Sequence, residues 1–467
     1  MAVKKTPARP IKTYAAALGY LDGLVNFERR PPTQRERSTI TLARTKRLLA
    51  ELENPHKRFR SVHIAGTKGK GSTATMLAQM LQNNGLKVGL FTSPHIMDVR
   101  ERICVDGERI PEADMTRLVA RVAGLASANK DDHPTFFEAI TVIAFQYFSE
   151  KSVDIAVVET GLGGRLDATN VLMPEVCAIT SISYDHMAQL GSSLEEIAAE
   201  KAGIFKDSVP VVSAPQPDSV KKVFRKIATE TKSPLHIAGD DIAFSYRFES
   251  SRGGGPQARI CVSTPTCHFD HLAVPLVGKH QAINCGVAIG VLDQLKNRGL
   301  PLDDEASVAG LAKVSLEGRM EMLCEKPRVL ADGAHNAASI EAVMRAIGQN
   351  IPYDSMVVIF GCCVDKDING MLRLIQLGAD KIIFTRMKSP RSADPADLAA
   401  RFTEVSGRMA QIAQSLPEAL EIAQKAITRE DLICITGSFY LVSEAKTLFA
   451  SHPHRVRPPT APAPVAD

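Results

Sequence analysis

The sequence lacks tryptophan altogether, and aromatic residues make up only 5% of its 467 positions. Proteins that bind nucleic acid stack bases on aromatic side chains and concentrate positive charge on one face. Here 56 Lys and Arg residues nearly balance 52 Asp and Glu residues, which leaves a formal charge of +4. The composition therefore argues against nucleic acid, and against an anionic membrane surface, as the main partner.

The chain also lacks a long apolar run and a paired-cysteine pattern. No stretch of about 18 apolar residues is present, so no membrane-spanning helix is expected. Segment 1–12 carries four basic residues without an apolar core, unlike a secretory signal. The nine cysteines are scattered and contain no C-x-x-C pair. This usage predicts reduced cysteines in a cytoplasmic protein.

What the chain does contain is a repeated alternation of apolar strands and amphipathic helices. The length suggests two or three domains, and near-continuous apolar runs are typical of parallel strands covered on both faces. The alternation predicts a two-domain α/β protein. Strands are expected at 61–65, 87–91, 155–158, 176–182, 328–331, 356–360, 381–385 and 432–436, with helices at 73–83, 136–148, 281–295, 337–347 and 417–426.

Domain boundaries follow from changes in composition. Residues 240–275 predict a small antiparallel meander, because alternating segments flank a Gly-rich turn. We expect an N-terminal domain over 1–314, a linker over 315–320 and a C-terminal domain over 321–450. The last segment, 451–467, holds five prolines and predicts a disordered tail.

The strongest chemical signal is a Gly-rich segment between a predicted strand and a predicted helix. Glycines allow backbone N–H groups to turn onto phosphate oxygens, and the helix N-terminus adds partial positive charge. Lys70 is placed to reach the β- and γ-phosphates. The strict G-x-x-x-x-G-K-[ST] pattern fails because Gly71 follows the lysine, so a Gly-rich turn with solvated lysines is the alternative. The segment consists of Gly66, Thr67, Lys68, Gly69, Lys70, Gly71 and Ser72.

Two further strand ends carry polar side chains that suit a metal ion. Glu159 closes the strand over 155–158, and Asp185-His186 follow the strand over 176–182. The carboxyl ends of parallel strands share one edge of a sheet, where ligands bind. Mg²⁺ needs few protein ligands beside water and phosphate oxygens. Glu159 and His186 are therefore candidate ligands; a histidine is less typical for Mg²⁺, and a capping or core role for His186 is the alternative.

A lysine near a helix end is the last candidate from the residues alone. Ser192 and Glu195 fit a capping box, and Gly203 fits a helix stop. Lys201 lies near the end of this helix, where it would compensate the helix dipole. If it is buried, its pKa falls and the neutral amine becomes reactive. The sequence does not choose between these roles.

The phosphate loop and further segments resemble the folate branch of the Mur ligase superfamily, the dihydrofolate synthase/folylpolyglutamate synthase family. The segments stand in the family's order and span most of the chain. They are 66–72, 92–95, 135–138, 159–170, 200–204, 318–319, 332–336 and 436–438. One departure is Lys68, which stands where many relatives carry Asn.

The resemblance implies a P-loop-type ATPase domain with a parallel sheet, a Rossmann-like C-terminal domain, and ATP in the cleft between them. It implies one or two Mg²⁺ ions, with a monovalent cation as a further candidate, and a monomeric enzyme. Implied metal ligands are Ser93, Glu159, His186 and Lys201 as a carbamyl-lysine. Implied nucleotide contacts beyond the loop are Asn284, Arg319 and Asp332. Implied contacts to the acceptor or to glutamate are Thr135, Phe136, Phe137, Glu138, Leu166, Asp167, Ala168, His335 and Ser438.

The activity that the resemblance implies is an ATP-dependent amide ligation. The substrate carboxylate is activated as an acyl phosphate, and the amine of L-glutamate displaces the phosphate. The acceptor is dihydropteroate, a reduced folate, or both. Lys70, Lys201 and His335 are the expected catalytic residues. A cell-wall Mur ligase and a nucleotide switch without ligase activity are the alternatives; the second is disfavoured because a simple switch does not need a second α/β domain with its own Asp332 and His335.

Overall fold

A computed structural model describes residues 11–451, apart from short gaps at 29, 31, 34–35, 37–39, 128–132, 252–254, 265, 275–277 and 429. The expected disordered tail lies outside the described residues. The described chain divides into two compact units. The first holds the residues up to Tyr246, Ile260–Ala273 and Ile283–Val314; the second holds Arg247–Arg259, Val274–Ala282 and the residues from Ser315 onward. The exact domain limits expected from the sequence, 1–314, 315–320 and 321–450, stay a prediction.

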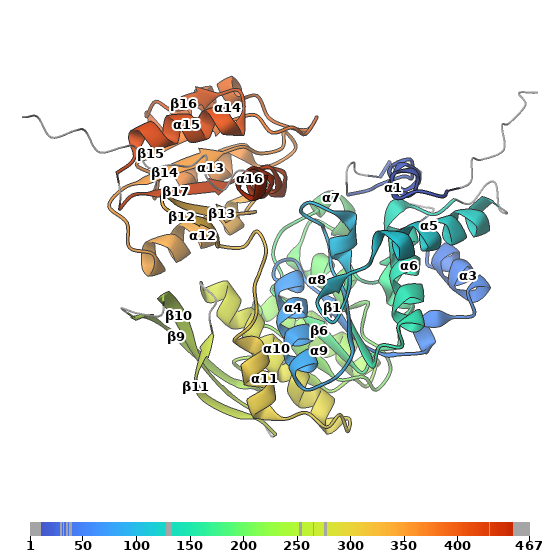
Figure 1. The fold of residues 1–467 in the computed structure, drawn as a ribbon. Helices are drawn as coiled ribbons and strands as arrows, with labels where there is room; N and C mark the ends of the chain where they lie inside the picture. The colour runs from blue at the N-terminus through green and yellow to red at the C-terminus, as the bar shows by residue number, and fades with distance from the viewer. Residues whose placement is uncertain are drawn as a thin grey trace, which may run out of the picture. The chain divides into compact units, whose positions relative to one another are not determined.

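The first unit is built on one mixed sheet. In the described part of the chain, eight strands lie in the order β4-β3-β2-β5-β1-β6-β7-β8 (Figure 1). Strands β2, β5, β1, β6, β7 and β8 are parallel, and β3 and β4 add an antiparallel edge. Their bounds are β1 Arg60–Ala65, β2 Val88–Phe91, β3 Ile103–Val105, β4 Glu108–Arg109, β5 Ile155–Glu159, β6 Val176–Ile179, β7 Val211–Ser213 and β8 Leu235–Ile237.

Helices cover both faces of this sheet, as parallel strands require. One face packs on α1, α3, α5, α6, α8 and α9 through two apolar clusters. On the other face α4 contacts β2 and β5, and α10 approaches β7 closely at Gly290. The helices are α1 Tyr14–Asp22, α3 Ala43–Glu51, α4 Lys70–Asn83, α5 Glu112–Ser127, α6 Phe136–Glu150, α7 Met187–Leu190, α8 Leu194–Ala202, α9 Asp218–Glu230, α10 Lys279–Asn297 and α11 Asp304–Leu311, with 3-10 turns η1 Pro55–Lys57, η2 Val99–Arg102 and η3 Ala168–Val171.

A three-stranded meander follows the first sheet. Its strands β9 Ala243–Ser251, β10 Gly255–Ser263 and β11 His268–Val274 lie in the order β11-β10-β9 among the described residues. The connections are too short for parallel crossovers, so neighbouring strands run antiparallel. The sequence predicts this meander correctly.

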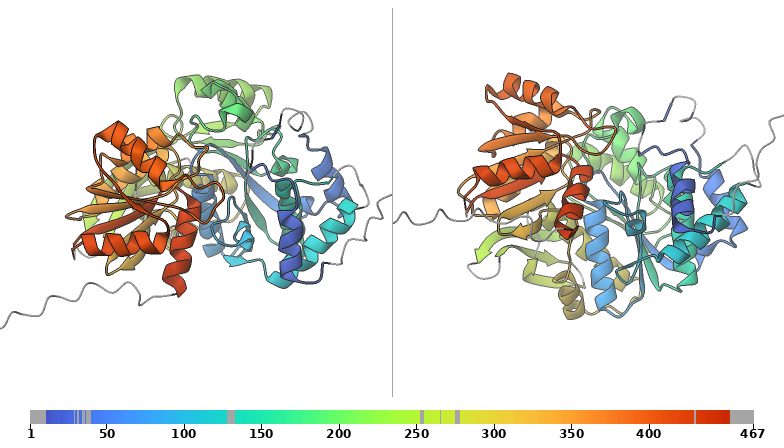
Figure 2. Two further views of the ribbon diagram at one scale, coloured as in Figure 1. Left: turned by 90° about the horizontal axis from the view of Figure 1, so that it is seen from above. Right: turned by 45° about the horizontal axis from the view of Figure 1, so that its top comes forward.

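The second unit is a smaller parallel sheet with helices on both faces. Among the described residues its six strands lie in the order β12-β13-β17-β14-β15-β16, and β12 is antiparallel to β13. Strand residues alternate between two apolar clusters: α12, α13 and α14 pack on one face, and α15 and α16 on the other (Figure 2). The bounds are β12 Glu321–Glu325, β13 Arg328–Asp332, β14 Met356–Phe360, β15 Lys381–Thr385, β16 Gln411–Ala413, β17 Leu432–Thr436, α12 Ala337–Asn350, α13 Ile368–Ile375, α14 Pro395–Ser406, α15 Leu416–Ala426 and α16 Phe439–Ser451.

The two-domain α/β architecture is thus confirmed, while three local expectations are wrong in detail. The strand expected over 176–182 ends at Ile179, because the buried residues after it belong to a loop. The helix expected from residue 73 begins at Lys70. The capping box of α8 is made by Ser193 and Glu196, one residue later than expected. All nine cysteines lie in the described part of the chain, and none of them forms a disulfide bond there. None of the described helices is long and apolar enough to span a membrane.

Candidate functional site

The candidate residues of the first unit follow strands that end at the same edge of the sheet. Ile64 of β1 pairs with Glu159 of β5, and Ala65 pairs with Ile179 of β6. The Gly-rich loop after β1 therefore begins beside the carboxylate that ends β5. This placement agrees with the rule that ligands bind at the carboxyl ends of parallel strands.

The Gly-rich loop is shaped by close contacts that leave no room for side chains at two glycines. Gly66 has φ +148°, and an added Cβ would lie 1.8 Å from Thr180 Oγ1. Gly69 has φ +89°, and an added Cβ would lie 2.1 Å from Asn284 Oδ1. Both positions need glycine for conformation and for space. Asn284, for which the family resemblance implies a nucleotide contact, packs directly on the loop.

The loop is anchored to the neighbouring strand end and leads directly into a helix. The Thr67 N–H donates to Ser181 O at 3.0 Å, and the Thr67 hydroxyl donates to Ser183 O at 3.2 Å. Helix α4 begins at Lys70, so its first N–H groups point toward the loop. Thr73 Oγ1 is buried and makes no hydrogen bond in the described part of the chain. This is the arrangement in which backbone N–H groups and a helix dipole bind phosphate.

Lys70 and Glu159 form the charged centre of the site. Lys70 Nζ lies 3.7 Å from Glu159 Oε1, and the Ser93 N–H donates to Glu159 Oε2 at 2.9 Å. The Glu159 side chain is only 3% exposed. Mg²⁺ prefers oxygen ligands and needs few of them from the protein. The Glu159 carboxylate, with Ser93 bound beside it, fits such a site. Within the described ranges, no group of three or more His, Cys, Asp or Glu residues is placed to hold a metal by itself.

Lys68 and His186 meet the same carboxylate. Lys68 Nζ lies 2.8 Å from Asp185 Oδ2, and His186 Nε2 lies 3.8 Å from Asp185 Oδ1. His186 does not close a strand: it stands half-exposed at the start of α7 in a left-handed conformation with φ +49°. Asp185 therefore links the cationic loop to the predicted histidine ligand.

Lys201 is a strongly perturbed base of the first unit. It is 4% exposed, and its Nζ donates to Gly66 O at 2.8 Å. Burial, followed by the charge of Lys70, lowers its pKa from 10.5 to about 7. A substantial fraction of this amine is neutral near pH 7, and it is held directly against the phosphate loop.

The segment after β5 docks on the end of the helix that carries Lys201. The Arg165 N–H donates to Glu200 O at 2.8 Å, and an added Cβ at Gly164 would lie 2.7 Å from Lys201 O. Asp167 accepts hydrogen bonds from the Gly161 and Leu162 N–H groups, both at 2.9 Å. Burial raises the pKa of the Asp167 carboxyl. The buried Asp167 carboxylate thus holds the backbone of the Gly-rich turn after β5 in place through these two hydrogen bonds.

In the second unit, three candidate residues follow adjacent strand ends. Asp332 of β13 pairs with Thr436 of β17, so Ser438 and His335 leave the same edge of that sheet. The His335 ring donates from Nδ1 to Gly333 O at 2.8 Å, which leaves the Nε2 lone pair as the basic position. Burial raises the pKa of the Asp332 carboxyl, and the nearby Arg319 opposes this shift.

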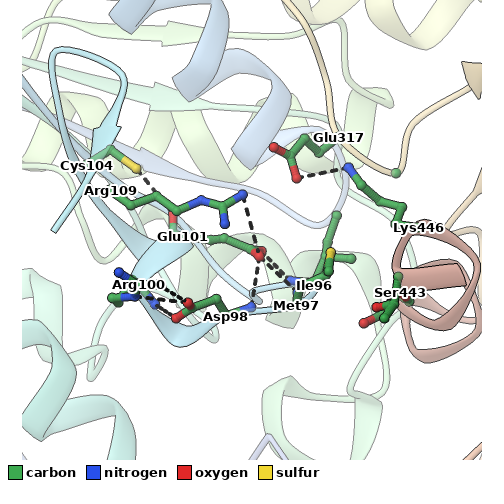
Figure 3. A network of polar contacts seen from close by, with 12 residues as sticks. Ile96, Met97, Asp98, Arg100, Glu101, Cys104, Arg109, Glu317, Ser443 and Lys446 are labelled. Atoms are coloured by element: carbon green, nitrogen blue, oxygen red, sulfur yellow. Dashed lines mark hydrogen bonds and ion pairs between the residues drawn. The ribbon is translucent and has the colours of Figure 1, made fainter. Parts of the chain in front are cut away.

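The predicted linker residues are bound to the second unit. The guanidinium carbon of Arg319 lies 4.3 Å from the Phe439 ring centroid. Lys446 of α16 forms ion pairs of 3.0 Å with both Glu317 and Glu321; the pair with Glu317 is drawn in Figure 3. The Gly318 N–H donates to Glu321 at 2.6 Å. These contacts fix the backbone around Arg319.

Comparison with known proteins decides the family. The Mur ligase middle domain matches residues 64–292, and the Mur ligase glutamate ligase domain matches residues 318–439. The dihydrofolate synthase/folylpolyglutamate synthase of Bacillus subtilis (strain 168) is 33% identical over 438 residues, covering 93% of this chain and 98% of that protein. The chain belongs to the Mur ligase family. Within it, the chain belongs to the dihydrofolate synthase/folylpolyglutamate synthase branch and is an ATP-dependent ligase.

Solved structures of the same Mur ligase branch share the fold. "E. coli FolC in complex with DHPP and ADP" superposes with a TM-score of 0.83 at 28% identity, covering 96% of this chain and all (100%) of that chain. Folylpolyglutamate synthase from Thermotoga maritima superposes with a TM-score of 0.80 at 31% identity, covering 94% and 96%. The resemblance inferred from the sequence is thus confirmed.

The structure of this Mur ligase brings together one set of predicted residues in the first unit: the loop 66–72, Ser93, Glu159, Lys201 and Asn284. Arg319, Asp332, His335 and Ser438 all lie within the second unit. The individual roles of all these residues stay predictions.

The residues predicted to bind the acceptor, at the start of α6 and after β5, make different kinds of contact. Thr135 and Glu138 form its capping box, and both Glu138 oxygens also accept from Arg44, at 2.9 and 2.7 Å. The Phe137 ring packs on Gly161, where an added Cβ would lie 2.5 Å from the ring. Phe136 lines a cavity. Leu166 is partly exposed, whereas Ala168 is buried.

Sequence reasoning missed the buried cation Arg102 and the residues around it. Arg102 is 1% exposed and donates to both oxygens of Glu28, at 2.8 and 2.6 Å. Its Nε donates to His95 Nδ1 at 2.8 Å. These residues are up to 74 positions apart, and although His95 lies in the family-like segment 92–95, no motif marks Arg102 or Glu28. The sequence gives no pattern for these contacts, because side chains that pair across long distances in the chain leave no local periodicity.

Proposed function

We propose that this ligase joins the amine of L-glutamate to the carboxylate of dihydropteroate, of a reduced folate, or of both. The proposal is supported above all by the phosphate loop with Lys70 and Glu159 at its mouth, in a chain of the folate branch. The neighbour "E. coli FolC in complex with DHPP and ADP" is described with ADP, and the Mycobacterium tuberculosis folylpolyglutamate synthase with ADP and AMPPCP. We propose that this chain also binds a nucleotide and a pteroate-type acceptor.

The reaction needs an activated carboxylate. The acceptor carboxylate oxygen attacks the γ-phosphorus of ATP, ADP leaves, and an acyl phosphate forms. The neutral amine nitrogen of glutamate attacks the acyl carbon, phosphate leaves, and the amine proton passes to a base. Lys70 and the N–H groups of the loop and of α4 counter the charge of the approaching anions. Mg²⁺ would supply further charge neutralisation, with Glu159, Ser93 and His186 as its proposed protein ligands.

Other roles are proposed residue by residue. His335 is the proposed base, because its Nδ1–H bond to Gly333 O leaves Nε2 to take a proton. Ser438 lies at the same sheet edge and is proposed to hold glutamate with it. Lys201 has the neutral character needed to add carbon dioxide and become a carbamate. Asn284, Arg319 and Asp332 are proposed nucleotide contacts.

The direct test measures amide formation with ATP, Mg²⁺ and labelled glutamate. Dihydropteroate, a reduced folate and a uridine-linked muramyl acceptor are compared side by side. We expect ADP release that depends on glutamate and on a folate-type acceptor. Use of the muramyl acceptor would instead identify a cell-wall ligase, and glutamate-independent hydrolysis would identify a nucleotide switch.

A matched variant tests the loop assignment. Lys70→Met keeps the length of the side chain but removes its charge, so turnover should fall by about 10²–10³-fold. The circular dichroism spectrum should not change, because Lys70 is only partly buried at the start of α4 and is not a member of an apolar cluster. Near-normal turnover in this variant would remove Lys70 from the reaction.

A further inference from the structure

A histidine lies among apolar neighbours in a central strand of the first unit. His63 of β1 is fully buried, and Val62, Ile64 and Ala65 beside it are buried as well. The Nδ1 atom of His63 has no hydrogen-bond partner among the described residues. A buried polar atom without a partner costs free energy that an apolar side chain at the same place would not cost. Packing alone therefore does not account for a histidine here.

The other ring nitrogen of His63 begins a series of hydrogen bonds that ends at the turn after β5. His63 Nε2 lies 2.7 Å from Thr169 Oγ1, and the Thr169 hydroxyl donates to Asp167 Oδ1 at 2.5 Å. The second carboxylate oxygen, Oδ2, accepts from the Gly161 and Leu162 N–H groups. This buried polar network, made of His63, Thr169 and Asp167, thus connects β1 with the backbone of the turn.

The direction of each hydrogen bond follows from the protons that are present. The Thr169 hydroxyl has one proton, which it donates to Asp167; Asp167 Oδ1 also accepts from the Thr169 N–H at 3.0 Å. The bond between His63 and Thr169 must then use a proton on His63 Nε2. Burial, followed by the charge of Lys206, lowers the pKa of His63 from 6.5 to about 3, so the ring is neutral and carries one proton. Every donor in the network therefore points toward Asp167.

The turn held by Asp167 lies between two groups of the candidate site. Gly161 stands two residues after Glu159, whose side chain forms the charged centre with Lys70. Three residues further on, the turn packs on the helix end that carries Lys201, because an added Cβ at Gly164 would lie 2.7 Å from Lys201 O. A shift of this backbone would therefore disturb the surroundings of both side chains.

We propose that His63 is a positioning residue for the ligase reaction, an inference that rests on the proposed function. By donating to Thr169, His63 fixes the hydroxyl in the orientation that donates to Asp167. The carboxylate is thereby held where it accepts from the two N–H groups of the turn. Because His63 is fully buried, it acts through Thr169 and Asp167 and not on a substrate.

Two variants at His63 separate the hydrogen-bond donor from the bulk of the ring. His63→Phe keeps a flat ring without the donor, whereas His63→Gln brings an amide donor to nearly the same place. We expect kcat for glutamate-dependent ADP release to fall about tenfold or more in His63→Phe and to stay within about threefold of the parent in His63→Gln. The Kd for an ATP analogue should not change, because the phosphate loop is anchored separately through Thr67. Equal kcat values in the two variants would overturn the inference.

Variants at Thr169 test whether His63 acts through this residue. Thr169→Val removes the hydroxyl at nearly constant size, and Thr169→Ser keeps it. Thr169→Ser should behave like the parent. Adding His63→Phe to Thr169→Val should lower kcat by less than about twofold further, because the hydroxyl that His63 holds is already absent. Losses that multiply in the double variant would show that His63 acts by another route and would contradict the proposal.

Hydrogen exchange tests the positioning without relying on catalysis. In His63→Phe the Leu162 amide, which donates to Asp167, should exchange about tenfold or more faster than in the parent. The Val211 amide, which donates to Pro234 O at 2.7 Å in the same unit, should keep its rate. Equal acceleration at both amides would show a general loss of stability and overturn the inference. If the parent lacks glutamate-dependent ADP release, the proposed function fails, and exchange at Leu162 then decides the positioning role by itself.

Discussion

The burial of Lys201 leads to a prediction about stability as a function of pH. The amine has a pKa near 10.5 when the chain is unfolded and about 7 when it is folded. Below pH 7 both states carry the proton, so the folded state bears the full cost of burying an ammonium group. Between pH 7 and 10.5 only the unfolded state keeps the proton, and the cost shrinks as pH rises. At 1.36 kcal/mol per pKa unit, the full cost is of the order of ~5 kcal/mol.

The assay compares the free energy of unfolding of the parent and of Lys201→Met in urea, from pH 7 to 10, in buffers free of carbon dioxide. The stability of Lys201→Met relative to the parent should be greatest near pH 7 and should decline by a few kcal/mol toward pH 10. Lys222→Met, at an exposed position of α9, is the matched control and should show no such trend. A difference between Lys201→Met and the parent that does not vary with pH would refute the reasoning.

Three further predictions use matched pairs of variants. Gly69→Ala should weaken binding of an ATP analogue by at least about tenfold, because its Cβ would meet Asn284; Gly85→Ala, at φ +82° with nothing within 4 Å, should show only about 1–2 kcal/mol of backbone strain. Arg44→Met should destabilise the protein by about 2–4 kcal/mol in urea unfolding by stranding the Glu138 carboxylate, whereas Arg47→Met, from an exposed pair, should cost under about 1 kcal/mol. Lys446→Met should speed hydrogen exchange at the Gly318 amide, and Lys446→Arg should restore protection. For each pair, equal effects of the two variants would contradict the reasoning given for that pair.

The parts of the fold that the sequence predicted best are strands buried on both faces. The strands expected over 356–360, 381–385 and 432–436 have these same bounds in the structure. The run over 176–182 misleads because Thr180 and Ile182 are also buried, although they lie in a loop. Apolar periodicity reports burial and does not distinguish a strand from a buried loop.

Start positions were harder to predict where the sequence offers two equivalent signals. Consecutive serines and glutamates make both Ser192/Glu195 and Ser193/Glu196 acceptable capping boxes, and the backbone selects the second. Helix α4 starts at Lys70 rather than three residues later, because the left-handed Gly69 already turns the chain into the helix.

The residues of the candidate site also differ in whether the sequence alone could predict them. The loop around Lys70 and the carboxylate of Glu159 could be found from local sequence, because a strand, a turn and a helix together mark them. The bond between Arg102 and His95, the ion pair between Lys68 and Asp185 and the cavity could not be found, since each depends on which loops the fold brings together.

The outer strands of the two sheets have a consequence for handling the protein at high concentration. Strand β4 has only two residues, Glu108 and Arg109, and both are charged and exposed. Strands β8 and β16 have three residues each. Short or charged margins offer another copy few unpaired backbone groups to extend. We therefore expect little tendency toward intermolecular strand addition at β4, β8 and β16.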